Sequence, residues 1–161
     1  MNSGAVLSGD GKYRYSLTRR WGHGSLMVWC MLNPSTADEN QDDPTIRRCM
    51  RFALREGYDG IHVVNLMSYR ATNPMAAIIA ADPFGPENDR YQIEAAALGD
   101  VVCAWGALAS RAAIVRSVEN FRSVGARLLC LGTTRGGQPR HPLYLRADTP
   151  LAEWRGVRIR P

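Results

Sequence analysis

Hydrophobic and polar positions follow each other along the chain in blocks that predict strands separated by helices. Apolar runs of strand length occur at residues 26–32, 61–66, 101–105 and 127–131. Helical periodicity or helix-capping signals mark the segments 44–56, 75–81, 89–98 and 107–124. Runs dominated by apolar residues are typical of strands buried on both faces. The pattern therefore predicts an α/β fold, a three-layer sandwich with a mostly parallel central sheet, in a single domain over residues 1–161.

The N-terminal part of the chain predicts an antiparallel hairpin. Residues 13–18 alternate aromatic and polar side chains, Gly22-His23-Gly24 favours a turn, and the apolar run 26–32 follows. Alternation interrupted by a short glycine-containing turn is typical of two strands that pair with each other. We therefore expect residues 13–18 to pair with residues 26–32.

Two helices have clear sequence signals. The first is predicted by Asp43 as the N-cap, Pro44 at the first helical position and Gly57 at its end. An arginine row at i, i+4 spacing on this helix consists of Arg47, Arg51 and Arg55. Such a row is either an ordinary solvated face or a contact with DNA. In the helix predicted for 107–124, the residues expected to face the core are Leu108, Ala112, Val115, Val118 and Phe121.

Composition and charge narrow the class of protein. With 45% hydrophobic and 22% charged residues, the 161-residue chain has the balance of a globular domain. It has 20 basic and 15 acidic side chains, a net charge of +5, and one lysine, Lys12. Arginine suits phosphate recognition, although a GC-rich genome that favours arginine codons explains the same bias.

The chain has no sign of a membrane or export signal. No apolar run approaches the roughly 18 residues of a membrane helix, and residues 1–12 lack the apolar stretch of a signal peptide. Cys30, Cys49, Cys103 and Cys130 have no C-x-x-C spacing and are expected to be buried free thiols. We expect a cytoplasmic monomer with no membrane partner, no metal and no cofactor.

Polar residues follow the predicted strands where ligands usually bind. Asn33 ends the first apolar run, Asn65 lies near the end of the second, and Trp105-Gly106 ends the third. His141 follows the glycine-rich loop after the last strand. In parallel α/β sheets, ligands bind beyond the carboxyl ends of the strands. Each residue alone is more often structural, but their order in one chain predicts a shared site.

These residues lie in stretches that carry a resemblance. The stretches are Met31–Asp38, Asp43–Thr45, Val63–Leu66, Arg70–Thr72, Asn88-Asp89, Ala104–Gly106 and Gly137–Leu143. From Tyr13 to about Trp154 the chain resembles a family of small bacterial and phage proteins catalogued as a domain of unknown function. More distantly, the strand-end motifs are similar to those of the uracil-DNA glycosylase superfamily, which implies a uracil-DNA glycosylase-like fold.

The glycosylase resemblance also implies roles for individual residues. Leu32-Asn33-Pro34 is similar to the water-activating motif, and Val64-Asn65-Leu66 to the strand end that reads the flipped base. His141-Pro142-Leu143 is similar to the stretch that contacts the leaving base and enters the duplex, and Val101–Gly106 resembles the apolar strand that closes on a Trp-Gly pair. At two positions this sequence differs from the glycosylase motifs, and both differences affect which base fits. No serine follows Pro142, and Ser35 stands where the strict uracil enzymes have a bulky aromatic residue, which leaves room for a substituent at C5 of a pyrimidine.

N-glycosidic hydrolysis needs one group that positions water and another that stabilises the leaving base, because positive charge develops on the sugar and negative charge on the departing base. Asn33 would hold a water molecule, and His141 would stabilise the leaving base with a hydrogen bond. Asn65 offers a donor and an acceptor to a pyrimidine edge. Either Tyr69 or Phe84 would stack on the flipped base, unless both belong to the core.

The predicted function is that of a monofunctional DNA glycosylase that removes a damaged, mismatched or modified pyrimidine, in repair or in defence against modified foreign DNA. The expected DNA contacts are Arg135 and Arg140 on phosphates and Leu143 and Tyr144 as a wedge. No lysine lies in the motifs, which argues against a Schiff-base lyase. The alternatives are a nucleotide or nucleoside hydrolase of the same fold and a nucleic-acid-binding module without catalysis.

Overall fold

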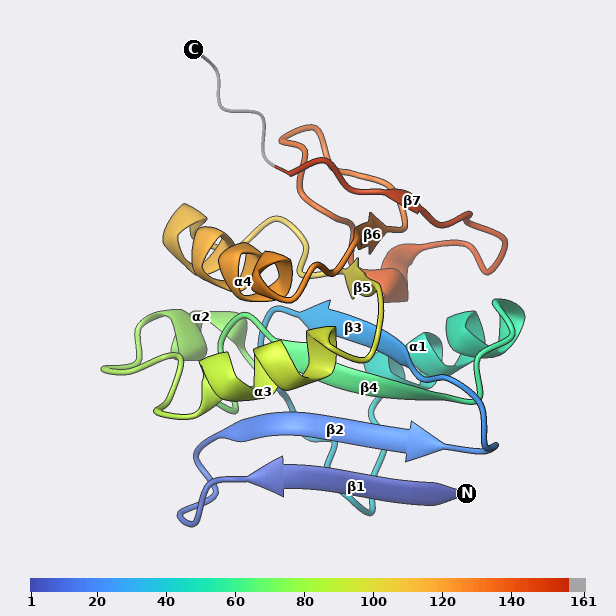
Figure 1. Ribbon diagram of the computed structural model, residues 1–161. Coiled ribbons are helices and arrows are strands. Elements are labelled where there is room, and N and C mark those ends of the chain that lie inside the picture. The colour runs from blue at the N-terminus through green and yellow to red at the C-terminus, as the bar shows by residue number, and fades with distance from the viewer. Residues whose placement is uncertain (157–161) are drawn as a thin grey trace.

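The computed structural model describes residues 1–156. They form a seven-stranded sheet in the order β1-β2-β4-β3-β5-β6-β7 (Figure 1). The strands are β1 (Asn2–Leu7), β2 (Arg14–Arg20), β3 (Met27–Met31), β4 (Gly60–Asn65), β5 (Val101–Cys103), β6 (Leu128–Cys130) and β7 (Ala152–Glu153). The helices are α1 (Pro44–Arg55), α2 (Pro74–Ile78), α3 (Asn88–Ala96), α4 (Arg111–Ser123) and the short 3-10 helix η1 (Pro142–Tyr144). The predicted α/β class is confirmed.

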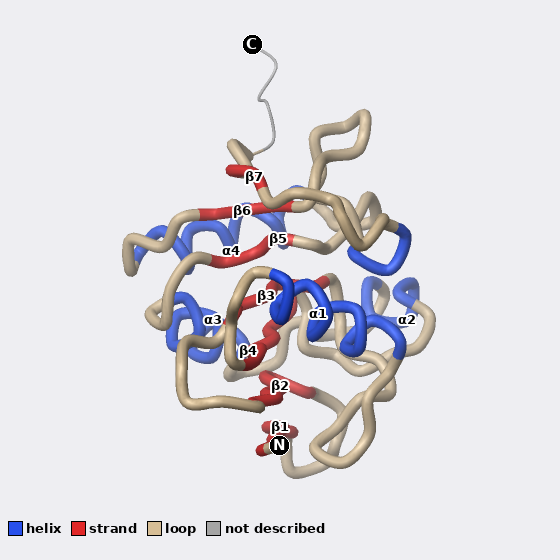
Figure 2. The backbone as a smooth tube through the Cα atoms, turned by 90° about the vertical axis from the view of Figure 1, so that its right-hand side faces the viewer, coloured by secondary structure: helices blue, strands red, loops and turns tan. Residues whose placement is uncertain are grey.

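Helices cover both faces of the sheet (Figure 2). On one face, α1 places Phe52 against Trp29 of β3, with 6.3 Å between the ring centroids. On the other face, α3 and α4 pack on the sheet, and Phe121 of α4 belongs to the same buried cluster as Cys30 and Val64. Each strand of the sheet centre therefore has an apolar layer on both sides, which explains the apolar runs in the sequence.

The prediction of a mostly parallel sheet is wrong, because the sheet is mixed. The β3–β4, β3–β5 and β5–β6 pairs are parallel, whereas β1–β2, β2–β4 and β6–β7 are antiparallel. The parallel pairs lie in the middle, where both faces are buried. The edge strands β1 and β7 are largely exposed and have little apolar pattern, so nothing in their sequence indicated that they extend the sheet antiparallel.

The predicted hairpin is also wrong in its pairing. β2 and β3 are not neighbours, because β4 lies between them: Val63 of β4 pairs with Leu17 of β2 on one side and with Trp29 of β3 on the other. The antiparallel hairpin at the N-terminus is formed instead by β1 and β2. β4, which comes later in the chain, occupies the position beside β2 that the Gly22-His23-Gly24 turn had predicted for β3.

The first predicted helix is confirmed, together with its caps. The Asp43 side chain accepts a hydrogen bond from the backbone N–H of Ile46 at 2.9 Å, and Pro44 occupies the first turn. Gly57 follows the helix with φ +81°, a left-handed conformation that favours glycine. These signals lie within the helix and its two flanking residues, so the sequence alone was sufficient to place α1.

The core-facing side of α4 agrees with the prediction only in part. The helix begins at Arg111, after the Ser110 N-cap, and its buried residues are Ala113, Ile114, Ser117 and Phe121. Leu108 and Val115, which were expected to face the core, are 57% and 44% exposed. Phe121 is buried and Val118 packs against the core, as predicted. The buried face also includes Ser117, which hydrogen-bonds across to Gln92 of α3, so the apolar periodicity identified the buried face only in part.

All four cysteines are buried free thiols, as predicted. Burial in the apolar core raises the pKa of the Cys30 and Cys49 thiols, so they stay protonated.

None of the helices in the described part of the chain is long and apolar enough to cross a membrane.

Candidate active site

A cavity of about 590 Å³ lies at the carboxyl ends of the central strands, on the same side of the sheet as α1. Met31 and Asn65, the paired last residues of β3 and β4, form part of its wall. Trp105, which follows β5, and His141, which precedes η1, also line it. The position agrees with the rule that ligands of parallel α/β sheets bind beyond the strands' carboxyl ends.

The cavity brings together most of the residues singled out in the sequence. These are Asn33, Ser35, Asn65, Arg140, His141, Leu143 and Tyr144. They come from three separate parts of the chain. The structure thus places at one cavity the strand-end residues that the order of motifs had predicted to share a site.

Asn65 is the most unusual polar side chain in the cavity wall. It is only 1% exposed, and neither its amide nitrogen nor its amide oxygen has a hydrogen-bond partner among the described residues. A buried polar group without a partner costs about 1–3 kcal/mol. A bound ligand that offers one acceptor and one donor would remove that cost, and the edge of a nucleobase has this pattern.

Asn33 is held in a fixed orientation. Its Nδ2 group donates hydrogen bonds to the carbonyl oxygens of Pro34, at 3.0 Å, and Ala71, at 2.8 Å. Both N–H donors are therefore used, and no described residue donates to Oδ1. The free Oδ1 atom is available as an acceptor for a water molecule in the cavity.

His141 is arranged as a neutral hydrogen-bond donor. Its Nδ1 atom accepts a hydrogen bond from the backbone N–H of Leu143 at 3.2 Å, so in the neutral ring the proton lies on Nε2. Burial lowers the pKa of His141, and the nearby Asp43 carboxylate opposes this effect. Nε2 has no partner among the described residues and can donate to a ligand.

Arginines of α1 hold the segment that carries His141. Arg48 donates to the carbonyl oxygens of Pro142, at 3.3 Å, and Leu145. Arg55 donates to carbonyl oxygens further along the same segment, those of Ala147 and Thr149. In the predicted exposed row, Arg47 also donates to a backbone carbonyl, that of Asp42. Much of the row therefore contacts protein backbone rather than forming a free face for DNA.

Three of the predicted site residues do not line the cavity. The Tyr69 ring packs edge-on against Tyr13, with centroids 5.9 Å apart, and lines a separate open depression. The Phe84 ring lies under the guanidinium of Arg116 at 4.3 Å. Arg135 is in the exposed loop after β6. Neither Tyr69 nor Phe84 is therefore placed to stack on a base in this cavity, whose aromatic walls are Trp105 and Tyr144.

Sequence reasoning missed two charged residues of the cavity, Arg14 and Asp43. Asp43 was noted as a helix N-cap and as part of a family stretch but was given no role in the site, and the N-cap uses one of its carboxylate oxygens. Arg14 is the first residue of β2, lies between Tyr13 and Tyr15 in the sequence, and is 2% exposed. An arginine inside an aromatic strand is the signal that could have drawn attention to it, because arginines are rarely buried without a partner.

The chain belongs to the family described as "Protein of unknown function (DUF1643)", whose model matches residues 14–143. The match runs from Arg14 in β2 to Leu143 in η1 and so includes most of the cavity wall. No curated protein and no solved structure matches the chain. The family is the first of the two predicted resemblances. The comparisons contain no support for the second, a relationship with uracil-DNA glycosylases.

Proposed function

We propose that the protein is a monofunctional DNA glycosylase that hydrolyses the N-glycosidic bond of a damaged, mismatched or C5-modified pyrimidine and leaves an abasic site. The single observation that carries the proposal is the Asn65 amide, buried in a cavity with both polar atoms unpaired. A base flipped out of a duplex offers the donor and acceptor that this amide lacks. Trp105 supplies a buried aromatic wall beside it.

The two reacting groups of the proposed site act on opposite sides of the bond. Asn33 Oδ1 accepts a hydrogen bond from the attacking water and positions it, since an amide is too weak a base to deprotonate water fully. His141 Nε2–H donates to the oxygen of the departing base as negative charge builds there. A neutral donor already fixed in place stabilises this charge without reorganisation, which is usually the largest contribution to catalysis.

The rim of the cavity suits a duplex. Tyr144 is 84% exposed and lies beside His141, with 5.5 Å between the ring centroids, and Leu143 is also exposed. Both are able to fill the space that a flipped nucleotide vacates in the stack. Arg140 is an exposed cation of the cavity wall and would contact a phosphate, as would Arg135 in the loop beyond it.

The absence of a lysine from the cavity supports a monofunctional enzyme. Lys12, the one lysine of the chain, lines the separate depression beside Tyr69. A Schiff-base lyase needs an amine at the sugar carbon, and the described cavity wall has none. The motif likeness to the uracil-DNA glycosylase superfamily supports the same activity, in a cytoplasmic monomer acting in repair or in defence against modified foreign DNA.

The test is an incubation with a panel of duplexes, each containing one uracil, mismatched thymine or C5-substituted pyrimidine. We expect release of the free base, detected by mass spectrometry, and strand cleavage only after alkali. The variant with both Asn33→Ala and His141→Ala is the matched control and should release no base above background. Hydrolysis of free nucleosides or nucleotides without action on any duplex would instead identify a nucleoside or nucleotide hydrolase. Binding of DNA without base release would identify a binding module.

A further inference from the structure

Arg14 is a buried cation of the cavity wall that uses little of its hydrogen-bonding capacity. Its Nη1 atom donates to the carbonyl oxygen of Ala37 at 2.7 Å. Nε is buried without a partner, and Nη2 makes no hydrogen bond to any described residue. None of the ion pairs within residues 1–156 includes Arg14. The Nε–Nη2 edge, the two-donor edge of the guanidinium, is therefore unpaired.

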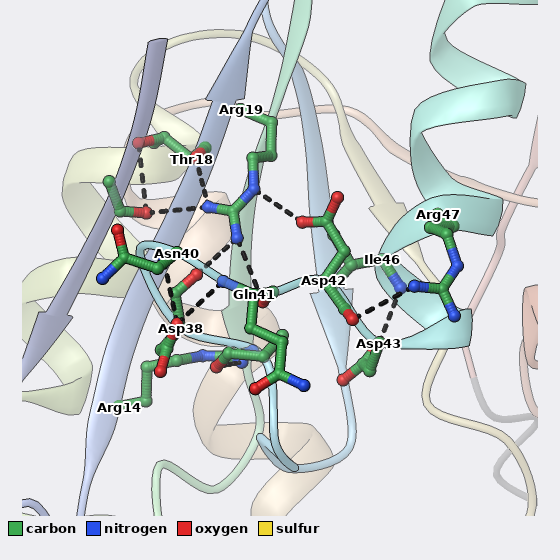
Figure 3. A network of polar contacts seen from close by, with 12 residues as sticks. Arg14, Thr18, Arg19, Asp38, Asn40, Gln41, Asp42, Asp43, Ile46 and Arg47 are labelled. Atoms are coloured by element: carbon green, nitrogen blue, oxygen red, sulfur yellow. Dashed lines mark hydrogen bonds and ion pairs between the residues drawn. The ribbon is translucent and has the colours of Figure 1, made fainter. Parts of the chain in front are cut away.

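Arg19 on the same strand provides the comparison. It is equally buried, and Figure 3 shows both arginines reaching the loop that leads into α1. The Arg19 Nε atom donates to the carboxylate of Asp42 at 2.7 Å, and its Nη2 atom donates to the carbonyl oxygens of Asp38 and Gln41. Arg19 thus anchors the loop with its guanidinium paired, so anchoring does not account for the unpaired edge of Arg14.

The unpaired edge belongs to a charged group. Burial lowers the pKa of Arg14 to about 10, so the guanidinium is still protonated at neutral pH. The Asp43 carboxylate, which also lines the cavity, favours that charge but does not form an ion pair with it. A buried cation with free donors is costly unless a ligand neutralises it. Two parallel N–H donors match the two oxygens of a carboxylate or phosphate group.

We propose that Arg14 forms an oxyanion subsite within the cavity, which binds a carboxylate or phosphate group of the substrate through its Nε–Nη2 edge. The inference rests on the proposed function for the pyrimidine part of the ligand. Ser35 lines the cavity from the loop that Arg14 contacts at Ala37, and its small side chain leaves room beside C5 of the base. On a base in DNA the oxyanion is therefore a carboxyl-bearing C5 substituent, whereas on a free nucleotide it is the phosphate.

The experiment measures binding of three probes by calorimetry: thymidine, 5-carboxy-2′-deoxyuridine and deoxyuridine monophosphate. Wild type should bind one of the anionic probes at least about 10-fold more tightly than thymidine, as expected for a charge-assisted bidentate contact. Arg14→Met should remove this preference while leaving thymidine binding within about 3-fold. Arg14→Lys should retain part of it. Arg19→Lys, the matched control outside the cavity, should retain all of it.

Each outcome either supports or overturns the oxyanion subsite at Arg14. A preference for the carboxylated nucleoside identifies the base-borne group, and a preference for the monophosphate identifies the phosphate. Equal binding of all three probes by wild type, no binding of any of them, or a preference that survives Arg14→Met overturns the subsite. If Arg14→Met does not fold, the wild-type preference and the Arg14→Lys variant still decide. Base release from duplexes is measured separately, so loss of the subsite and loss of the glycosylase activity remain distinguishable.

Discussion

Asn65 lies between two buried polar regions that differ in how their hydrogen bonds are satisfied. On the face covered by α3 and α4, its backbone oxygen accepts hydrogen bonds from Asn88 at 3.3 Å and Gln92 at 2.8 Å. These two belong to a group that we name the closed network: Ser68, Asn88, Gln92, Ser117 and Asn120. On the cavity side, the side chains with unpaired atoms form the open cluster: the buried Arg14 and Asn65 and the half-buried Asn33.

The difference separates polar groups that stabilise the fold from polar groups that serve a ligand. Gln92 donates to Ser117 at 2.7 Å and accepts from Asn120 at 2.8 Å, so both ends of its amide are used. Asn65 is just as buried, yet both ends of its amide are free. A satisfied network contributes stability and order, whereas unsatisfied atoms reduce stability unless something binds to them. Burial alone does not distinguish the two regions, but hydrogen-bond pairing does.

The largest expected effect concerns catalysis at the cavity. Asn33→Ala and His141→Ala should each lower the rate of base release by about 100-fold or more, a loss of about 3 kcal/mol, because each removes a group that acts in the transition state. Single-turnover kinetics on the preferred duplex measure the effect. Ser68→Ala in the closed network should leave the rate within a few-fold. Near-wild-type rates for both cavity variants would eliminate the mechanism.

The second prediction compares stability in the two regions. Gln92→Ala should lower the free energy of unfolding by about 2 kcal/mol, since it leaves buried partners unsatisfied. Asn65→Ala should not lower it, because the Asn65 amide makes no hydrogen bond that could be lost and the substitution removes two buried unpaired polar atoms. Urea denaturation monitored by circular dichroism measures both. Equal destabilisation by the two variants would mean that the open cluster is structural.

The third prediction concerns the space beside the base. A tyrosine at position 35 would fill the space next to C5, so Ser35→Tyr should reduce release of C5-substituted pyrimidines about 10-fold relative to uracil. Thr36→Tyr is the matched control, because Thr36 lines the separate depression and not the cavity. Competition between a uracil duplex and a C5-substituted duplex gives the ratio directly. An unchanged ratio in Ser35→Tyr would refute the open space at C5.

The smallest expected effect is a pH dependence of stability. Burial lowers the pKa of His141 below the 6.5 of an unperturbed histidine, so between these two values the unfolded state binds more protons than the folded state. Stability is therefore complete above pH 6.5 and falls as the pH drops through the pKa of the folded state. His62 has the same direction of shift, also from burial. His141→Gln and His62→Gln should each make thermal stability between pH 7 and pH 5 less dependent on pH, and an unchanged slope in His141→Gln would contradict the neutral donor.

The candidate site was predictable to the extent that its residues end strands. Asn33 and Asn65 could be grouped because the carboxyl ends of adjacent parallel strands meet at one edge of a sheet, and His141 because it follows the loop after the last of these strands. Tyr69 and Phe84 were selected for their chemistry alone, and the structure places them against Tyr13 and Arg116 instead. A side chain's neighbours depend on loops whose course has no periodic signal, so the choice of aromatic wall could not be made from the sequence.

The sequence by itself determined the features whose causes are local. The caps of α1 and the apolar strands of the sheet centre depend on neighbouring residues or on burial of both faces. The tertiary structure decided the position of β4 between β2 and β3, the exposed antiparallel edges, and the pairing of buried polar groups. Arg14 and Arg19 show the reason. Both are buried arginines on one strand. Only their contacts with the loop at residues 37–42 leave the Nε–Nη2 edge of Arg14 unpaired and the guanidinium of Arg19 fully paired.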